Sequence, residues 1–257
     1  NFKNSKLEDE GLHRFFDINK KKGWSIRKAW KLLQDIPNGD LEDYILDVSY
    51  RPFDVRNIFY HDAIVWRTVK KIMKHMLKEN IGIVTGRQQL SGRECNYFFI
   101  SKNVISDGLI RSDNKGGESL FPLYLYNSED NKSSGDGKNI MMVFEPQDKY
   151  INRTPNINAN IINKLNQTYK KKITPEAILY YIYGIFYSNI YRQKYADFLK
   201  IDFPGVPFTS SYKVFESISA LGERIARLHL MDSGELDPPV ARYRGTGSDR
   251  IEKIQFD

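Results

Sequence analysis

Residues 86–93 concentrate planar hydrogen-bonding side chains in one short segment. Arg87, Gln88, Gln89, Ser91 and Arg93 stand there between two apolar runs, with a glycine near each end. Arginine fits the edge of guanine and glutamine that of adenine in the major groove of DNA. We predict a loop that contacts bases. The sequence leaves a second interpretation open, in which Arg87 braces the fold through an internal salt bridge.

Two further groups are weaker candidates. Lys102 and Asn103 follow the second apolar run, with Arg111 beyond them, and we expect them in a loop that neighbours residues 86–93. Arg51 and Arg56 flank a Pro-Phe pair. These two arginines either clamp phosphates or brace the first strand, and the sequence favours neither interpretation.

Residues 65–77 have apolar side chains at helical spacing with bases between them, which predicts a basic amphipathic helix. Its candidate phosphate contacts are Arg67, Lys70, Lys71 and Lys74. They contact DNA only if their face of the helix meets it. Otherwise they form a solvated surface.

The bases are unevenly distributed. Residues 51–112 carry eleven Lys and Arg against five acids, and residues 151–200 carry eight against two. Clustered bases suit a polyanion, because phosphate neutralisation needs Lys and Arg close together. A lysine-rich solvated surface would give the same counts.

Signatures of catalysis are missing. The sequence has no phosphate-binding G-x-x-x-x-G-K-[ST] loop, no dinucleotide-binding G-x-G-x-x-G and no G-x-S-x-G elbow. The single Cys95 and four histidines do not suggest a zinc site. The Asp-Pro-Pro-Val run at 237–240 lacks the aromatic that stacks on a flipped base in amino methyltransferases, so we interpret it as a turn. We predict no metal site and no catalytic centre.

The composition is that of a folded domain. The chain has 257 residues, of which 40% are hydrophobic and 28% charged, and its formal net charge is +7. The longest uncharged apolar run, around residues 178–190, is shorter than the roughly 20 residues of a membrane span, so we expect no membrane partner. The lone cysteine fits a reducing cytoplasm. The initial Asn suggests a piece of a longer protein.

The order of helical and strand patterns along the chain predicts an α+β fold. A helical lead-in precedes a twisted, mostly antiparallel β-rich middle, and a helical second half ends in a C-terminal strand that returns to the sheet. Helices are expected at 24–33, 65–77, 161–169, 176–199 and 215–231, with starts at Thr154-Pro155 and Thr174-Pro175. Strands are expected within 44–60, 81–85, 97–100, 120–126, 140–144 and 250–256.

Tyrosines at 180, 183, 187 and 191 recur at helical spacing. Such a stripe is more often core or interface than a stacking platform for single-stranded nucleic acid, so we assign it to packing.

An ordered set of motifs resembles a known family from about residue 24 to the end. The motifs are YRPFDVRNIFY (50–60), IMKHML (72–77), NIGIVTGRQ (80–88), FPLYLY (121–126), ITPEAI (173–178), YYIYG (180–184), YRQKY (191–195) and FPGVPF (203–208). Together they resemble the C-terminal target-recognition domain of single-polypeptide Type I (Type ISP) restriction-modification enzymes.

The resemblance implies a non-catalytic module that recognises a sequence in double-stranded DNA. It would direct an adenine methyltransferase, with a nuclease and a helicase, that lies upstream in the same polypeptide and serves bacterial defence. S-adenosylmethionine, ATP and magnesium would belong to the full-length enzyme, and this part would hold no cofactor.

The division expected is a helical linker from the methyltransferase (1–47), a β-rich DNA-recognition subdomain (48–149) and a helical subdomain with the C-terminal strand (150–257), packed as one domain. Two alternatives stay open. One is a scaffold module that docks on its parent chain, and the other is a catalytic methyltransferase fragment.

Overall fold

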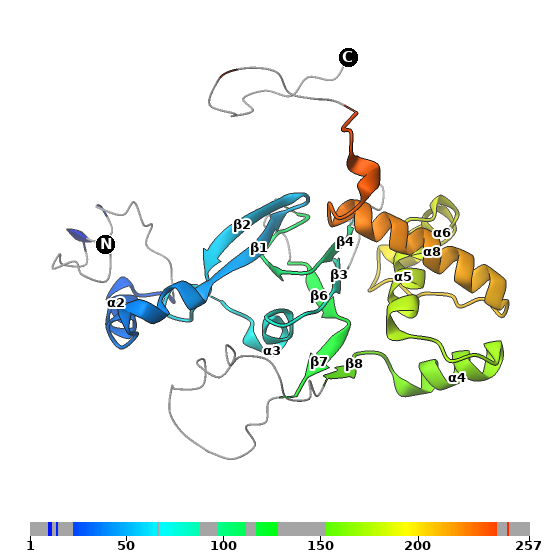
Figure 1. Cartoon of the computed structure of the whole chain (residues 1–257), viewed down its shortest axis with the longest axis horizontal. Coiled ribbons are helices and arrows are strands. Elements are labelled where there is room, and N and C mark those ends of the chain that lie inside the picture. Colours follow the sequence, from blue (N-terminus) through cyan, green and yellow to red (C-terminus); the bar gives the residue numbers. More distant parts are fainter. Residues whose placement is uncertain are drawn as a thin grey trace.

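The computed structural model describes residues 23–65, 67–87, 97–111, 117–127 and 153–240, together with residues 10, 11, 14 and 246. Three small sheets occupy the first half of these residues and helices the second half (Figure 1). The predicted α+β class is confirmed. Within the described ranges, every helix is too short or too polar to cross a bilayer.

The lead-in helix α2 (Ile26–Gln34) begins where the sequence predicts. Ser25 caps it, accepting a hydrogen bond from the backbone N–H of Lys28 at 3.3 Å. Its buried face packs with Tyr44, at the end of the second of two short 3₁₀ turns, η1 (Asn38–Asp40) and η2 (Glu42–Tyr44). The helix is therefore joined to the start of the first strand.

The first sheet is built on a hairpin. Strands β1 (Ile45–Arg51) and β2 (Asp54–Phe59) pair antiparallel, and β5 (Val104–Ile105) pairs parallel to β1. Phe53, in the connecting turn, has φ of 64° and is exposed. The strands predicted within residues 44–60 are confirmed.

The second sheet has the order β4-β3-β6, with both pairings antiparallel. All residues of β3 (Gly82–Thr85) and β4 (Phe98–Ser101) are buried, as their continuous apolar runs predict. Thr85 pairs with Phe98 and with Ser119, the first residues of β4 and of β6 (Ser119–Pro122). The chain therefore leaves β3 at the end of the sheet where its two neighbours begin.

The strand predicted at 120–126 is present but divided in two, because the chain changes sheets at Leu123. Strand β7 (Tyr124–Tyr126) pairs with β8 (Arg153–Pro155) in a third sheet. The buried Asn80 side chain accepts from the Tyr124 backbone N–H at 3.1 Å and donates to its carbonyl at 2.8 Å. Tyr124 therefore bonds to a side chain instead of extending the β6 ladder.

Two helix boundaries differ from the prediction. Thr154-Pro155 belongs to β8 and starts no helix; α4 (Ala159–Tyr169) begins after its cap Asn158. The helix predicted at 65–77 is reduced to α3 (Lys70–Met73) and the 3₁₀ turn η3 (Lys74–Met76). Val69 precedes α3 with φ of 46°, a left-handed conformation that stops the helix from extending backwards.

The helix predicted at 176–199 is three helices, α5 (Pro175–Phe186), α6 (Asn189–Lys194) and α7 (Ala196–Leu199). The break follows because the Ser188 side chain accepts from the Tyr191 N–H and starts a new helix. The predicted start at Thr174-Pro175 is confirmed. The last long helix, α8 (Tyr212–His229), precedes the 3₁₀ turn η5 (Gly234–Leu236).

The main core lies between the second sheet and helices α5 and α8. Ile83, Phe98 and Ile100 pack there with Tyr183 and Ala226. Tyr183 is fully buried, which confirms the assignment of the tyrosine stripe to packing. Where α5 crosses α8, Gly184 and Gly222 allow the backbones to approach closely.

The strands predicted at 140–144 and 250–256 lie outside the described residues. The predicted division at 47 and 149 stays a prediction. Strand β8 from beyond residue 150 pairs with β7 from before it, so the two parts share a sheet.

Candidate nucleic-acid interface

Arg87 projects from the end of the buried central strand β3 and is exposed. Its Nε lies 2.9 Å from Oδ1 of Asp202, and its Nη2 lies 3.4 Å from Oδ2. This hydrogen bonding raises the pKa of Arg87 and lowers that of Asp202. The ion pair joins the sheet to the segment after α7 across the surface. The other loop candidates, Gln88, Gln89, Ser91 and Arg93, lie outside the described residues.

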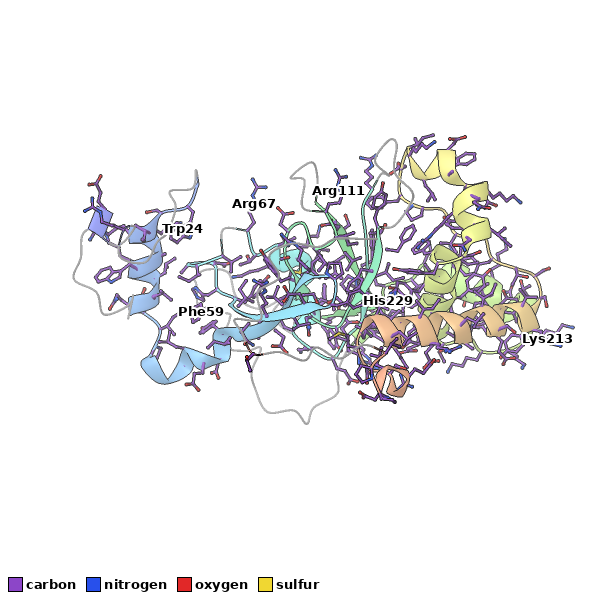
Figure 2. The ribbon with its side chains drawn as sticks, turned by 90° about the horizontal axis from the view of Figure 1, so that it is seen from above. Trp24, Phe59, Arg67, Arg111, Lys213 and His229 are labelled. Carbon is purple, nitrogen blue, oxygen red and sulfur yellow. The ribbon has the colours of Figure 1, made fainter. Side chains whose placement is uncertain are left out.

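Arg111 lies at the same end of the sheet as Arg87. Its backbone N–H donates to Glu118 Oε1 at 2.6 Å, and Glu118 directly precedes β6, whose first residue pairs with Thr85 at the end of β3. In Figure 2, Arg111 and Arg67 project from the same edge of the molecule. We call Arg67, Arg87 and Arg111 the basic edge.

Lys102 and Asn103 lie at the other end of the sheet. They form a tight turn after Ser101, which pairs with Gly82 at the start of β3, and the Asn103 N–H donates to Ser101 Oγ at 3.0 Å. Lys102 Nζ is 2.8 Å from Asp232 Oδ2. The expectation that this loop neighbours residues 86–93 is wrong, because antiparallel pairing puts the two connections at opposite ends of β3.

Arg51 and Arg56 both cover the ring of Tyr50. Their guanidinium carbons lie 4.3 and 4.0 Å from the ring centroid. Arg56 also forms an exposed ion pair with Asp54 at 2.7 Å, and Arg51 donates to the Tyr50 carbonyl at 2.7 Å. Both arginines are therefore held near the tip of the hairpin against Tyr50, a residue of β1.

The short helix α3 and the turn η3 present their lysines to solvent. Lys70 forms an ion pair with Asp62, while Lys71 and Lys74 are exposed and form no ion pair with any residue that the structure describes. Lys71 and Lys74 are thus available to phosphates.

A pocket of about 230 Å³ lies beside the hairpin tip, lined by Pro52, Phe53, Phe98, Phe99, Ile110, Tyr187 and His229. His229 is its one titratable imidazole; Nδ1 is 2.7 Å from the Tyr183 hydroxyl, and burial lowers the pKa of His229. Among the residues that the structure describes, none that lines this pocket carries a carboxylate that could act as an acid or base. No group of three potential metal ligands occurs among the described residues.

The acidic partners Asp202 and Asp232 were missed at the sequence level. Asp202 lies 115 residues from Arg87 and Asp232 lies 130 residues from Lys102. The local pattern around either base carries no signal for partners so distant. The Asp-Pro-Pro-Val run at 237–240 is exposed along its length.

Comparison with protein families gives one model, described as the Type ISP C-terminal specificity domain, which matches residues 2–257. A search of curated proteins finds no match.

Two solved structures share the fold. A DrdV–DNA complex is 20% identical with a TM-score of 0.58, and the match covers 88% of this chain and 19% of that one. The ATP-dependent Type ISP restriction-modification enzyme LlaBIII bound to DNA is 20% identical with a TM-score of 0.60, covering 90% of this chain and 14% of that one. The chain thus spans less than one fifth of either similar protein.

Proposed function

Because the chain belongs to the Type ISP C-terminal specificity domain family, we propose that it recognises a sequence in double-stranded DNA for a restriction-modification enzyme. The observation that carries this proposal is the family match across residues 2–257. The likeness in fold to DrdV and LlaBIII, both solved with DNA, supports it.

The geometry of the basic edge suits this role. Arg87 lies two residues beyond the buried strand β3, and the Arg111 backbone N–H is held by Glu118, which directly precedes β6, so both lie at one end of the buried sheet. Arginine carries a planar fork of donors that matches the O6 and N7 atoms of guanine. The ion pair of Arg87 with Asp202 is exposed, and exposed ion pairs are weak enough to be exchanged for contacts with DNA.

We further propose that an adenine methyltransferase, with a nuclease and a helicase, lies upstream in the same polypeptide. DrdV and LlaBIII are more than five times longer than the part this chain matches, which leaves room for such units in proteins of this kind. S-adenosylmethionine, ATP and magnesium would act in those parts. The present chain would position DNA and catalyse nothing, in the cytoplasm where its DNA target lies.

Selection from a pool of randomised duplexes tests this proposal. The purified chain is incubated with the pool, and bound DNA is sequenced over several rounds. Enrichment of one short sequence is the expected result. Binding without any enriched sequence would contradict the proposal, as would the absence of binding at low salt, where phosphate contacts are strongest.

A further inference from the structure

Four lysines gather away from the basic edge, where the end of α4 meets the start of α8. Lys170, Lys171 and Lys172 follow α4, and Lys213 is the second residue of α8. All four are exposed, and none forms an ion pair within the part of the chain that the structure describes. We call these residues the lysine cluster.

Tyrosine contacts join the two segments that carry the cluster. The Lys171 Nζ atom lies 3.8 Å from the centroid of the Tyr212 ring, and that ring contacts Tyr169 at 5.8 Å between centroids. The Tyr169 hydroxyl donates to the Thr209 carbonyl at 2.6 Å. Lys171 is therefore held against Tyr212, the residue directly before Lys213.

The backbone of the lysine turn is also fixed. The Asn166 carbonyl accepts from the N–H groups of Lys170 and Lys171, and its side-chain Oδ1 accepts from the Ile173 N–H at 2.7 Å. The turn that carries the three consecutive lysines is thus held by three hydrogen bonds that Asn166 accepts. Little backbone order has to be gained when a partner binds.

Two carboxylates near the lysine cluster offset only part of its four positive charges. Glu176 lies in the first turn of α5 and Glu216 is the fifth residue of α8; they accept hydrogen bonds from the hydroxyls of Tyr124 and Tyr212, and neither forms an ion pair with a lysine of the cluster. Helices α5 and α8 both begin here, capped by Thr174 and Ser211, and helix N-termini carry partial positive charge. The cluster therefore presents concentrated positive charge to solvent.

We propose that the lysine cluster is a second, sequence-independent contact for the phosphate backbone of DNA that flanks the recognised site. This proposal rests on the proposed function. In Figure 2, Lys213 lies at one end of the molecule, whereas Arg67 and Arg111 project from its upper edge. The cluster would extend the contact with the duplex beyond the bases that are read.

The chemistry favours DNA over an acidic protein surface. Lysine is a compact charge with rotatable donors, which suits phosphates at a regular spacing and needs no planar partner. An acidic protein surface would pair its carboxylates with an apolar centre. The turn at 170–172 consists of lysines alone, and Val214, which follows Lys213, is the exposed large apolar side chain beside them.

The test compares two double variants on a random-sequence duplex of about 40 base pairs, across about 50 to 200 mM salt. Lys172→Gln/Lys213→Gln removes two charges and spares Lys171, which packs on Tyr212. Lys28→Gln/Lys31→Gln removes two exposed charges from α2, at the opposite end of the molecule (Figure 1). A Lys170→Gln/Lys172→Gln variant repeats the test without changing α8.

Each phosphate contact contributes about 0.9 to the slope of log affinity against log salt. We expect the lysine-cluster variants to lower the magnitude of that slope by about 1.8. Over this salt range, the factor by which affinity falls should then be about ten times larger for the wild type than for the variant. The α2 variant should retain the wild-type slope. Selection from randomised duplexes should return the same preferred sequence for the wild type and for each variant.

An unchanged slope in the cluster variants would overturn this inference while leaving the proposed function intact. A changed preferred sequence would also overturn it, since the lysines would then read bases. Unaltered DNA binding together with weaker association to the upstream part of a parent enzyme would assign the cluster to an acidic protein surface instead. A wild-type chain that binds no duplex would refute both proposals.

Discussion

Arg87 and Asp202 form a two-point ion pair on the surface, with Nε 2.9 Å from Oδ1 and Nη2 3.4 Å from Oδ2. Both side chains are more than half exposed, at 68% and 57%. The ion pair links the end of β3 to the segment that follows α7. It holds the guanidinium in one place, and solvent weakens it enough for DNA to compete.

The Arg87→Ala variant of a full-length enzyme should relax its choice of site by about tenfold or more, because the variant cannot make the bidentate base contact that we propose for Arg87. The melting temperature should change little, since the ion pair is exposed. Methylation of cognate and near-cognate duplexes measures the first effect, and thermal unfolding measures the second.

Asp202→Asn provides the matched control. It removes the competing carboxylate and leaves Arg87 in place, so it should strengthen binding to the site where Arg87→Ala weakens it. Unchanged site preference in a destabilised Arg87→Ala protein would instead identify Arg87 as a structural brace.

Lys71→Gln/Lys74→Gln should weaken binding to specific and random duplexes to the same degree, because phosphate contacts carry no sequence information. The salt slope should fall by about 1.8 if both lysines meet phosphates. Titration of both duplexes at several salt concentrations measures this effect. A loss confined to the specific duplex would show that the two lysines read bases.

Gly222→Ala should destabilise the fold by about 3 kcal/mol or more, through overpacking of the crossing between α5 and α8. A Cβ atom at this position would lie 1.9 Å from the Tyr180 carbonyl oxygen and 2.8 Å from the Gly184 nitrogen. Urea unfolding measures the change. Gly205→Ala, where a Cβ atom meets nothing within 4 Å, should unfold like the wild type.

Lower pH should destabilise the protein partly through His75. Its Nδ1 accepts the Tyr126 N–H at 3.0 Å, and burial lowers the pKa of the imidazole. In the unfolded chain the pKa is about 6.5, so below that value the unfolded state binds more protons than the folded state. The stabilisation is complete above the unfolded pKa and is lost as pH falls through the folded pKa.

His75→Asn keeps an acceptor and removes the proton site, so its melting temperature should fall less between about pH 7.5 and pH 5.5 than that of the wild type. Burial also lowers the pKa of His61 and His229, which accounts for the dependence that remains. Parallel curves for the two proteins would exclude His75 as a contributor.

The sequence correctly predicted those helices and strands whose formation depends on residues close to one another in the chain. The apolar runs of β3 and β4 and the Thr174-Pro175 start of α5 are of this kind. Thr154-Pro155 has the same local pattern as Thr174-Pro175, yet it became a strand because β7 offers a partner. Sequence spacing does not show distant pairing of this kind.

The candidate site was predictable only in part for the same reason. The residue types at Arg87 and Arg111 pointed to DNA, and both lie at one end of the second sheet. Lys102 was placed wrongly, because β4 carries the chain across the sheet, so the connection after β4 lies at the opposite end from the connection before it. The spacing of residues around Asn80 does not indicate that its side chain separates β6 from β7.

The pairing of β7 with β8 makes the chain a candidate for fragment complementation. Tyr126 and Arg153 are paired neighbours in that sheet, and the Asn156 N–H donates to the Leu123 carbonyl at 2.7 Å. A backbone cut between Tyr126 and Arg153 would leave one piece with an unpaired edge and the other with the strand that completes it. Two separately produced halves should therefore reassemble, joined by the shared sheet and by the core between β4 and α5.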